Sequence, residues 1–172
     1  MRGQEKGQYN GNVLYLSTFS KILAPGIRLA WVIGPVDVVA KLAQAKQGVD
    51  LNTSTLNQMI AYEVGKDGFI NEHVKVIRRV YNERRDVMLD ALEEHCPKSI
   101  KWTHPEGGLF LWVTLPDGND AAVLMKEALK ENVAYVPGGS FHPVGGGENT
   151  MRLNFSFSKP ETINEGIGRL GK

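Results

Sequence analysis

Apolar and polar positions along this chain of 172 residues change their period several times, and each change predicts a new helix or strand. A polar, glycine-rich stretch at 1–12 predicts a flexible lead. Two short apolar runs follow, 13–19 and 29–34, of the kind that is buried on both faces of a parallel sheet. This order of elements predicts an α/β fold, in which parallel-sheet strands and helices are followed by an α+β arrangement. The predicted helices cover 35–46, 56–65, 69–96, 119–131 and 159–170, and the later strands cover 100–103, 109–115, 133–136 and 151–155.

The loop between the first two predicted strands holds Lys21 beside Ser20 and, after a Pro25-Gly26 turn, Arg28. A lysine forms an imine with an aldehyde only as the neutral amine, so burial and the nearby Arg28 cation are expected to lower its pKa from about 10.4. Proline fixes one backbone dihedral and glycine permits a positive one, so the turn is expected to bring Arg28 back towards Ser20. A guanidinium and hydroxyls suit a phosphate dianion. The loop therefore predicts pyridoxal phosphate chemistry.

This loop resembles the lysine motif of fold-type I, class I aminotransferases, in the branch that contains the aminoadipate and kynurenine aminotransferases. Ala30 departs from the motif, because the family usually has glycine at this position. The resemblance implies an aminotransferase that moves an amino group from an amino acid to a 2-oxo acid through a pyridoxal phosphate imine on Lys21. The matching residues are Thr18, Phe19, Ser20, Lys21, Leu23, Pro25, Gly26, Arg28 and Trp31.

The resemblance also implies roles for other residues. Thr18, Ser20 and Arg28 match the positions that anchor the cofactor phosphate, and Lys21 matches the catalytic lysine. Arg152 matches the arginine that binds the α-carboxylate of the substrate. A guanidinium suits that role because its planar fork binds a carboxylate bidentately. The family further implies a homodimer. Two more segments resemble small-domain signatures of these enzymes, 107–112 and 136–141.

Family members carry a long segment before the lysine motif, whereas 20 residues precede Lys21 here. The chain is therefore expected to be the C-terminal part of such an enzyme, either truncated or the product of a broken gene. Residues 1–68 would be the remnant of the large cofactor-binding domain. Residues 69–172 would be the small domain, with the helix 69–96 as the link and a boundary near Asp67-Gly68. The chain alone is expected to bind the cofactor weakly or not at all, and to be inactive.

Two other functions share the lysine motif. In some bacterial transcription regulators, an aminotransferase-like domain follows a DNA-binding winged helix and works as a pyridoxal phosphate-binding sensor. Related decarboxylases and lyases have the same fold and differ mainly in side-chain contacts outside this chain. The aminotransferase is favoured because the segment 28–32 is closer to that branch. The sequence ahead of residue 1 in the parent protein would identify a regulator.

Charge and composition limit the kinds of partner that this chain is expected to bind. A balance of 20 basic and 19 acidic residues offers no electrostatic reason to expect a nucleic acid or an anionic membrane. Arginines and acidic residues intermingle over 69–96, which predicts a solvated, salt-bridged face. A single cysteine, Cys96, rules out an internal disulfide framework, and no apolar run reaches the roughly 20 residues that span a bilayer. A cytoplasmic protein is therefore expected. The histidines and Cys96 lack the spacing of metal ligands, so no metal site is expected.

Overall fold

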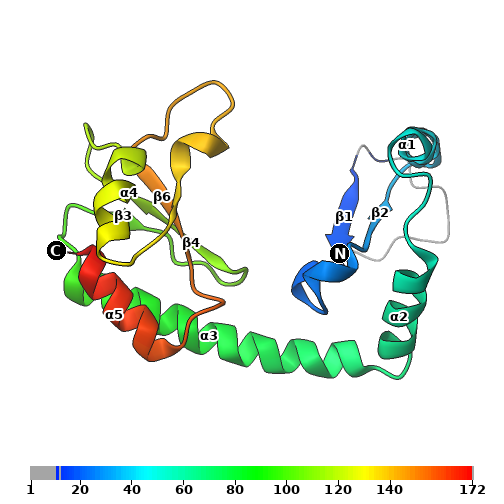
Figure 1. Cartoon of the computed structure of the whole chain (residues 1–172), viewed down its shortest axis with the longest axis horizontal. Helices are drawn as coiled ribbons and strands as arrows, with labels where there is room; N and C mark the ends of the chain where they lie inside the picture. The colour runs from blue at the N-terminus through cyan, green and yellow to red at the C-terminus, as the bar shows by residue number, and fades with distance from the viewer. Residues whose placement is uncertain (1–10, 12, 172) are drawn as a thin grey trace. The chain divides into compact units, whose positions relative to one another are not determined.

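A computed structural model describes residue 11 and residues 13–171, and the chain divides into two compact units, Met1–Lys75 and Val76–Lys172 (Figure 1). The division falls inside the long helix α3 (Phe69–His95). The predicted flexible lead at 1–12 lies outside the described residues, apart from Gly11. The expected domain boundary near Asp67-Gly68 stays a prediction. Each unit is described separately below.

The first unit contains a two-stranded sheet and two helices before α3. The strands β1 (Tyr15–Thr18) and β2 (Ala30–Ile33) lie inside the two predicted apolar runs. They pair antiparallel, with Thr18 opposite Ala30, so the expected parallel pairing is wrong for them. The loop 19–29 is shorter than the dozen or more residues that a parallel crossover needs, so it reverses the chain instead. The helices are α1 (Val36–Val49) and α2 (Thr55–Gly65).

The apolar composition of β1 and β2 predicted that both faces of these strands would be buried. This prediction is wrong for the described chain. Leu16 is 69% exposed and Ile33 is 61% exposed. Among the residues of this unit that the structure describes, one apolar residue is buried, Ala61 in α2. An isolated two-stranded sheet is marginally stable in water because so little apolar surface is removed from solvent. The described part of the first unit therefore has almost no core of its own.

The second unit is built on a four-stranded sheet in the order β3-β4-β6-β5. Its strands are β3 (Lys101–Trp102), β4 (Phe110–Thr114), β5 (Val136–Pro137) and β6 (Thr150–Asn154), and every neighbouring pair is antiparallel. Two helices complete the unit, α4 (Ala121–Lys130) and α5 (Pro160–Leu170). Asp120 caps α4, because its carboxylate accepts the N–H of Ala122 at 2.7 Å.

The prediction of a strand at 133–136 is mostly wrong, because β5 begins only at Val136. The backbone N–H of Val133 donates to the carbonyl of Ala128 at the end of α4, at 2.9 Å, and is not available to a sheet. The Tyr135 hydroxyl donates to the Ala121 carbonyl at 2.8 Å, which ties the segment to the start of α4. These two bonds hold the residues before β5 against the helix.

One face of the sheet in the second unit is packed and the other is open. Along β4, Leu111 and Val113 are buried, and along β6, Met151 and Leu153 are buried, because successive strand residues point to opposite faces. These residues form one core cluster with apolar residues of α3, α4 and α5. Figure 1 shows α5 alongside the C-terminal half of α3. The opposite face carries the intervening residues of the two central strands, Phe110, Trp112 and Arg152.

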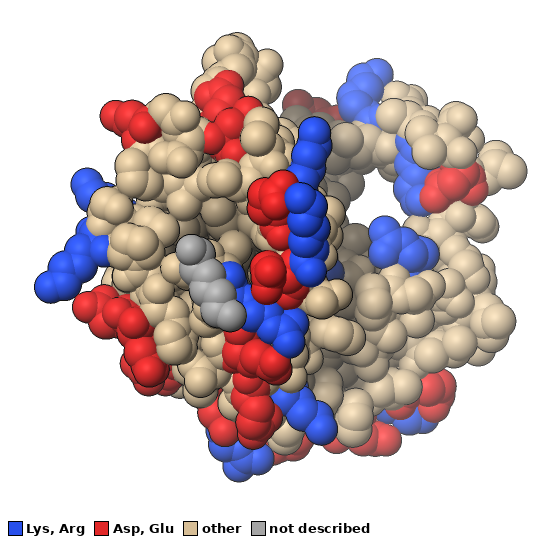
Figure 2. All heavy atoms as spheres, turned by 60° about the vertical axis from the view of Figure 1, so that its left-hand side comes forward, with Lys and Arg blue, Asp and Glu red and all other residues tan. Residues whose placement is uncertain are grey.

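The arginines of α3 do more than form a solvated, salt-bridged face. Arg84 donates to the backbone carbonyl of Ser156 after β6, and Arg85 donates to the carbonyl of Pro105 at 3.2 Å. Arg85 also pairs with Asp86 at 2.6 Å. These arginines thus attach α3 to loops of the sheet. Figure 2 shows acidic and basic side chains interspersed over one face of the molecule.

Candidate active site

The loop that carries Lys21 is closed by its own backbone. It contains two 3₁₀ turns that lie against each other, η1 (Phe19–Lys21) and η2 (Pro25–Ile27). The N–H of Phe19 donates to the carbonyl of Leu29 at 3.0 Å, and the Phe19 carbonyl accepts the N–H groups of Leu23 and Ala24 at 2.8 and 3.1 Å. These bonds hold both ends of the loop together where β1 and β2 pair. Lys21 therefore lies in a compact loop at the carboxyl end of β1.

The two predicted phosphate-binding hydroxyls lie together in this loop. Thr18 is the N-cap of η1, and its Oγ1 accepts the backbone N–H of Ser20 at 3.1 Å. The two side-chain oxygens are 2.9 Å apart and hydrogen-bonded. The Thr18 hydroxyl also lies 3.1 Å from the carbonyl of Leu29. The structure thus brings together two hydroxyls on the turn that ends at Lys21.

Arg28 shares the loop but its guanidinium does not reach the hydroxyls. Its Nη1 donates to the carbonyl of Pro25 at 2.9 Å, in its own turn. The positive φ expected of Gly26 falls instead on Arg28, whose φ is 49°. A positive φ outside glycine is uncommon and costs free energy, and such strain collects at functional sites. The expected convergence of Arg28 on Ser20 is therefore absent from this conformation.

The Lys21 side chain is exposed, so the burial that was expected around its amine is not provided by the part of the chain that the structure describes. Within that part, no hydrogen bond or ion pair holds the amine. An aromatic contact nonetheless stabilises the loop around Lys21. Phe19 packs against Trp31 across the hairpin, with ring centroids 4.9 Å apart. Ala30 is exposed, so its methyl group is accommodated without a clash.

Sequence reasoning missed Asn57, which supports the lysine loop from α2. Its Nδ2 donates to the carbonyl of Ile27 at 3.0 Å. Its backbone N–H donates to the Oγ of Ser54, the N-cap of α2, at 3.4 Å. The Ser54 side chain therefore caps the N-terminus of α2. The signal for Asn57 was an amide beside Gln58 in a mostly apolar helix, which does not reveal a partner thirty positions away in the chain.

Arg152 lies in the second unit, on the open face of the sheet. Its guanidinium carbon is 4.0 Å from the centre of the Phe110 ring and 4.9 Å from the centre of the Phe141 ring. Phe110 begins β4, and Phe141 ends the 3₁₀ turn η3 (Gly138–Phe141). Guanidinium groups are attracted to aromatic faces. We call Phe110, Phe141 and Arg152 together the aromatic clamp.

The clamp holds a guanidinium that has no acidic partner among the residues that the structure describes. The Nε of Arg152 is buried and makes no hydrogen bond there. A cavity of about 290 Å³ adjoins the arginine, with Phe110, Val136 and Asn154 in its wall. A buried donor without an acceptor costs free energy and is rare in folded proteins outside functional sites. The clamp is therefore suited to bind an anion.

Gly138 is required for the position of Phe141. A Cβ at Gly138 would lie 1.7 Å from Oγ1 of Thr150 and 2.9 Å from its carbonyl oxygen. Gly139 differs, because the nearest atom to a Cβ there is 4.0 Å away. Trp112 supports the same turn, since its ring meets Phe141 edge-on with centroids 5.4 Å apart. The turn η3 thus packs directly on β6, the strand that carries Arg152.

The chemistry of these residues fits a phosphate-bearing aldehyde and a carboxylate. Lys21 offers an amine, Thr18 and Ser20 offer paired hydroxyls, and Arg152 offers an unpaired guanidinium. Over the residues with a described position, no group of three or more His, Cys, Asp or Glu side chains could hold a metal ion. In the same part of the chain, no helix is both long and apolar enough to cross a membrane.

Comparisons with known proteins agree with this donor set. The family model for aminotransferase class I and II matches residues 3–170. A 2-aminoadipate transaminase of Thermus thermophilus is 49% identical over 160 residues, which are 93% of this chain and 40% of that protein. The crystal structure of an α-aminoadipate aminotransferase of that organism, complexed with N-(5'-phosphopyridoxyl)-L-leucine, matches with a TM-score of 0.88 and 49% identity. That match covers 92% of this chain and 40% of the solved chain.

The chain belongs to the class I and II aminotransferases, whose cofactor is pyridoxal phosphate, and it shares their α/β fold. It spans about 40% of the length of the curated aminotransferases it matches. A more distant relative is an HTH-type transcriptional regulator of Bacillus subtilis, YdfD, which is 33% identical over 162 residues. Those residues are 94% of this chain and 33% of the regulator.

Proposed function

We propose that this chain is the C-terminal part of a pyridoxal phosphate-dependent aminotransferase, and that the whole protein moves an amino group from an amino acid to a 2-oxo acid. The observation that carries the proposal is the aromatic clamp, which presents a guanidinium without an acidic partner beside a cavity. Amino acids and 2-oxo acids share an α-carboxylate, and a guanidinium fork binds that group bidentately. The family supplies the cofactor on which such substrates react.

Lys21 would hold the cofactor through its aldehyde, and Thr18 and Ser20 would hold its phosphate. When bound, the cofactor stabilises the carbanion that forms at the substrate α-carbon. The amine of Lys21, once replaced by the substrate amine, takes the proton from that carbon as general base. Arg28 would add charge to the phosphate site only after its guanidinium leaves the Pro25 carbonyl. Arg152 would bind the α-carboxylate of the substrate.

Replacement of Arg152 tests this function in the full-length parent. Arg152→Ala is expected to raise the KM for amino acids strongly and to leave the cofactor absorbance nearly unchanged, because it removes a charged pair worth about 1.5–3 kcal/mol. Arg152→Lys should recover only part of the loss, since an ammonium cannot bind a carboxylate with a planar fork. Arg79→Ala on the exposed face of α3 is the matched control. Unchanged amino-acid kinetics in Arg152→Ala would contradict the proposal.

A second experiment tests Lys21 without measuring activity. Borohydride reduction of the cofactor-loaded parent, followed by peptide mapping, should place the pyridoxyl label on Lys21. The control is Lys41→Arg, which should keep the label, whereas Lys21→Arg should lose it. A label on another lysine in the unaltered protein would show that the site assignment is wrong.

The kinship with YdfD supports a second candidate, a sensor domain in an aminotransferase-like transcription regulator. The aminotransferase is favoured because the enzyme relative is 49% identical and the regulator 33% identical over similar lengths. A helix-turn-helix in the parent ahead of this segment would reverse the choice. A homodimer and a cytoplasmic location belong to the same proposal, and gel filtration and cell fractionation of the parent would test them.

A further inference from the structure

The loop that carries Lys21 contains a backbone conformation that an arginine rarely adopts. Arg28 has φ 49° and ψ 46°, in the left-handed region. This region costs a residue other than glycine free energy, because its Cβ approaches the following carbonyl oxygen. Asparagine, aspartate and histidine are the residues most enriched there, and arginine is not among them. The surrounding structure must therefore hold Arg28 in this conformation.

The peptide unit that joins Ile27 to Arg28 is held at both ends. A peptide unit is planar, so the Ile27 carbonyl and the Arg28 N–H turn together, and this rotation changes φ of Arg28. The N–H donates to the carbonyl of Pro25 across 3.4 Å, which is longer than an ordinary hydrogen bond. Nδ2 of Asn57, in α2, donates to the Ile27 carbonyl at the ordinary length of 3.0 Å. The Asn57 amide is therefore the stronger restraint on this peptide unit.

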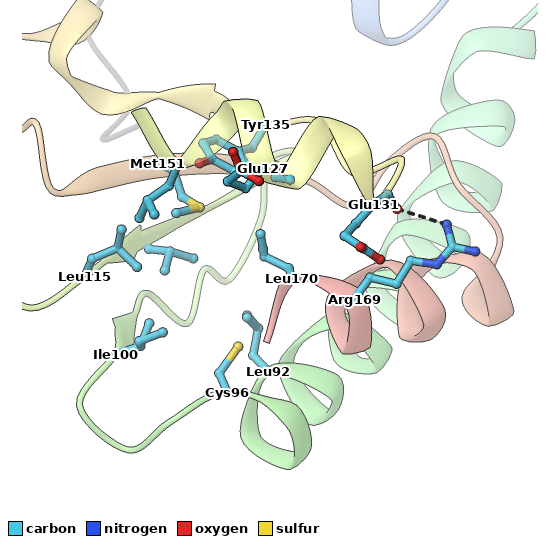
Figure 3. A pocket seen from close by; sticks show the side chains of 13 residues that line it. Leu92, Cys96, Ile100, Leu115, Glu127, Glu131, Tyr135, Met151, Arg169 and Leu170 are labelled. Atoms are coloured by element: carbon cyan, nitrogen blue, oxygen red, sulfur yellow. Dashed lines mark hydrogen bonds between the residues drawn. The ribbon is translucent and has the colours of Figure 1, made fainter. Parts of the chain in front are cut away.

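Two more residues other than glycine have a left-handed backbone in the described chain, Leu51 with φ 60° and Asn132 with φ 58°. The carbonyl before Leu51 accepts the N–H of Asn52 at 2.6 Å. The carbonyl before Asn132 accepts Nη1 of Arg169 at 3.2 Å, and Figure 3 shows this bond as a dashed line between Glu131 and Arg169. A hydrogen bond to the preceding carbonyl thus accompanies each of these left-handed conformations, whether the donor is near in the chain or distant.

We infer that Asn57 is a positioning residue for the cofactor phosphate, and that it acts by fixing the backbone of Arg28. The inference rests on the proposed function, in which Arg28 is a phosphate ligand. The turn η2, which ends just before Arg28, lies against η1, which contains Ser20. A rotation of the peptide unit to a negative φ would point the Arg28 side chain in another direction. A side chain that is fixed beforehand loses less conformational entropy when its ligand binds, so Asn57 should raise phosphate affinity without touching the phosphate.

Absorbance titrations of the cofactor-free full-length parent test this role. Pyridoxal phosphate is compared with pyridoxal, which has the same aldehyde and ring but no phosphate. Asn57→Ala should raise the Kd of pyridoxal phosphate about 2- to 10-fold, the range expected for one hydrogen bond, and leave the Kd of pyridoxal unchanged. A merely structural role would weaken both ligands alike. If the alanine variant does not fold, Asn57→Leu, which has nearly the shape of asparagine without its donor, should give the same result.

Gln58→Ala is the matched control. The Gln58 side chain donates to the carbonyl of Thr53 at 3.0 Å, so this variant removes the same kind of bond from the same helix but outside the lysine loop. Both Kd values should stay unchanged in it. Arg28→Ala should itself weaken pyridoxal phosphate and spare pyridoxal, and adding Asn57→Ala to it should change almost nothing further, because Asn57 acts through Arg28.

Three results would overturn the inference. The first is an equal loss of both ligands in Asn57→Ala. The second is an unchanged Kd of pyridoxal phosphate in Asn57→Ala while Arg28→Ala raises it. The third is an unchanged Kd in Arg28→Ala, which would remove Arg28 from the phosphate site and leave Asn57 nothing to position. The proposed aminotransferase function is judged separately, by the pyridoxyl label on Lys21 and by the kinetics of Arg152→Ala.

Discussion

The aromatic clamp makes a quantitative prediction about how a substrate carboxylate is bound. The Phe110 ring lies closer to the guanidinium of Arg152, at 4.0 Å, and is half-buried, whereas Phe141 lies at 4.9 Å and is 45% exposed. A cation–π contact is worth about 0.5–1 kcal/mol at an exposed site and about 2 kcal/mol when desolvated. Loss of either ring leaves the guanidinium less well oriented, so Phe110→Leu should cost up to about 1–2 kcal/mol of carboxylate binding, and Phe141→Leu up to about 0.5–1 kcal/mol.

These free energies convert to about 5- to 30-fold for Phe110→Leu and about 2- to 5-fold for Phe141→Leu. The assay is the transamination kinetics of the full-length parent, with KM and kcat measured separately for an amino acid and for a 2-oxo acid. The loss should fall on KM for both substrates, because both carry the carboxylate that Arg152 is proposed to bind. Phe157→Leu is the matched control, since that ring is 89% exposed and takes no part in the clamp.

Two results would refute the reasoning. The first is a Phe141→Leu effect that exceeds the Phe110→Leu effect, because the distances and exposures order them the other way. The second is a loss of kcat at unchanged KM, which would mean that the rings act on the chemical step and not on carboxylate binding. Combining either variant with Arg152→Ala should add almost nothing, since the rings act through that guanidinium.

Three further predictions concern the chain itself. Gly138→Ala should destabilise the chain by about 1–3 kcal/mol in urea unfolding, because its Cβ meets Thr150, whereas Gly139→Ala should be nearly neutral; equal effects would contradict the packing described here. Burial raises the pKa of Cys96 above its usual 9.0, and burial and then Asp120 raise the pKa of Tyr135 above 10.0. Both groups therefore hold their protons more tightly in the folded chain than in the unfolded chain. The free energy of unfolding should keep its full value below pH 9.0 and fall as the pH rises further. In Cys96→Ala, this fall should begin at a higher pH. Finally, the isolated chain should bind pyridoxal phosphate no better than about millimolar, because one amine and two hydroxyls contribute only about 3–4 kcal/mol; micromolar binding with turnover in a coupled assay would disprove this.

Periodicity in the sequence predicted the kinds and approximate limits of most elements. The long helix predicted at 69–96 is α3 (Phe69–His95), because its apolar stripe repeats over many turns. The spacing of apolar residues along a strand does not indicate the direction of the neighbouring strand. The antiparallel pairing of β1 and β2 therefore could not be predicted from composition. The segment before Val136 has a strand-like composition, yet its backbone bonds go to α4. Strand propensity lost there to the C-terminal cap of α4, in which the N–H of Val133 donates to the carbonyl of Ala128 and Asn132 has a positive φ.

The candidate site shows the same division between local and distant information. The pairing of Thr18 with Ser20 is local, and a motif that placed two hydroxyls beside a lysine could predict it. The clamp around Arg152 depends on Phe110 and Phe141, which approach only after β4, η3 and β6 are assembled. The segments that contain both rings were noticed for their resemblance, but nothing in either segment indicated a contact with the arginine. No sequence pattern likewise indicates the hydrogen bond from the Asn57 side chain to the carbonyl of Ile27.

The two units differ in how much of their apolar surface is covered, and this difference bears on the proposed chemistry. The second unit buries a continuous core that includes Leu92, Leu111 and Phe155, and this core holds the strands that carry the aromatic clamp. The lysine loop belongs to the unit in which Ala61 is the buried apolar residue among those described. Proton transfer from carbon needs a base held in place and screened from water. The described part of the first unit leaves Lys21 exposed and so gives it no such screen, whereas the aromatic clamp is formed within the second unit.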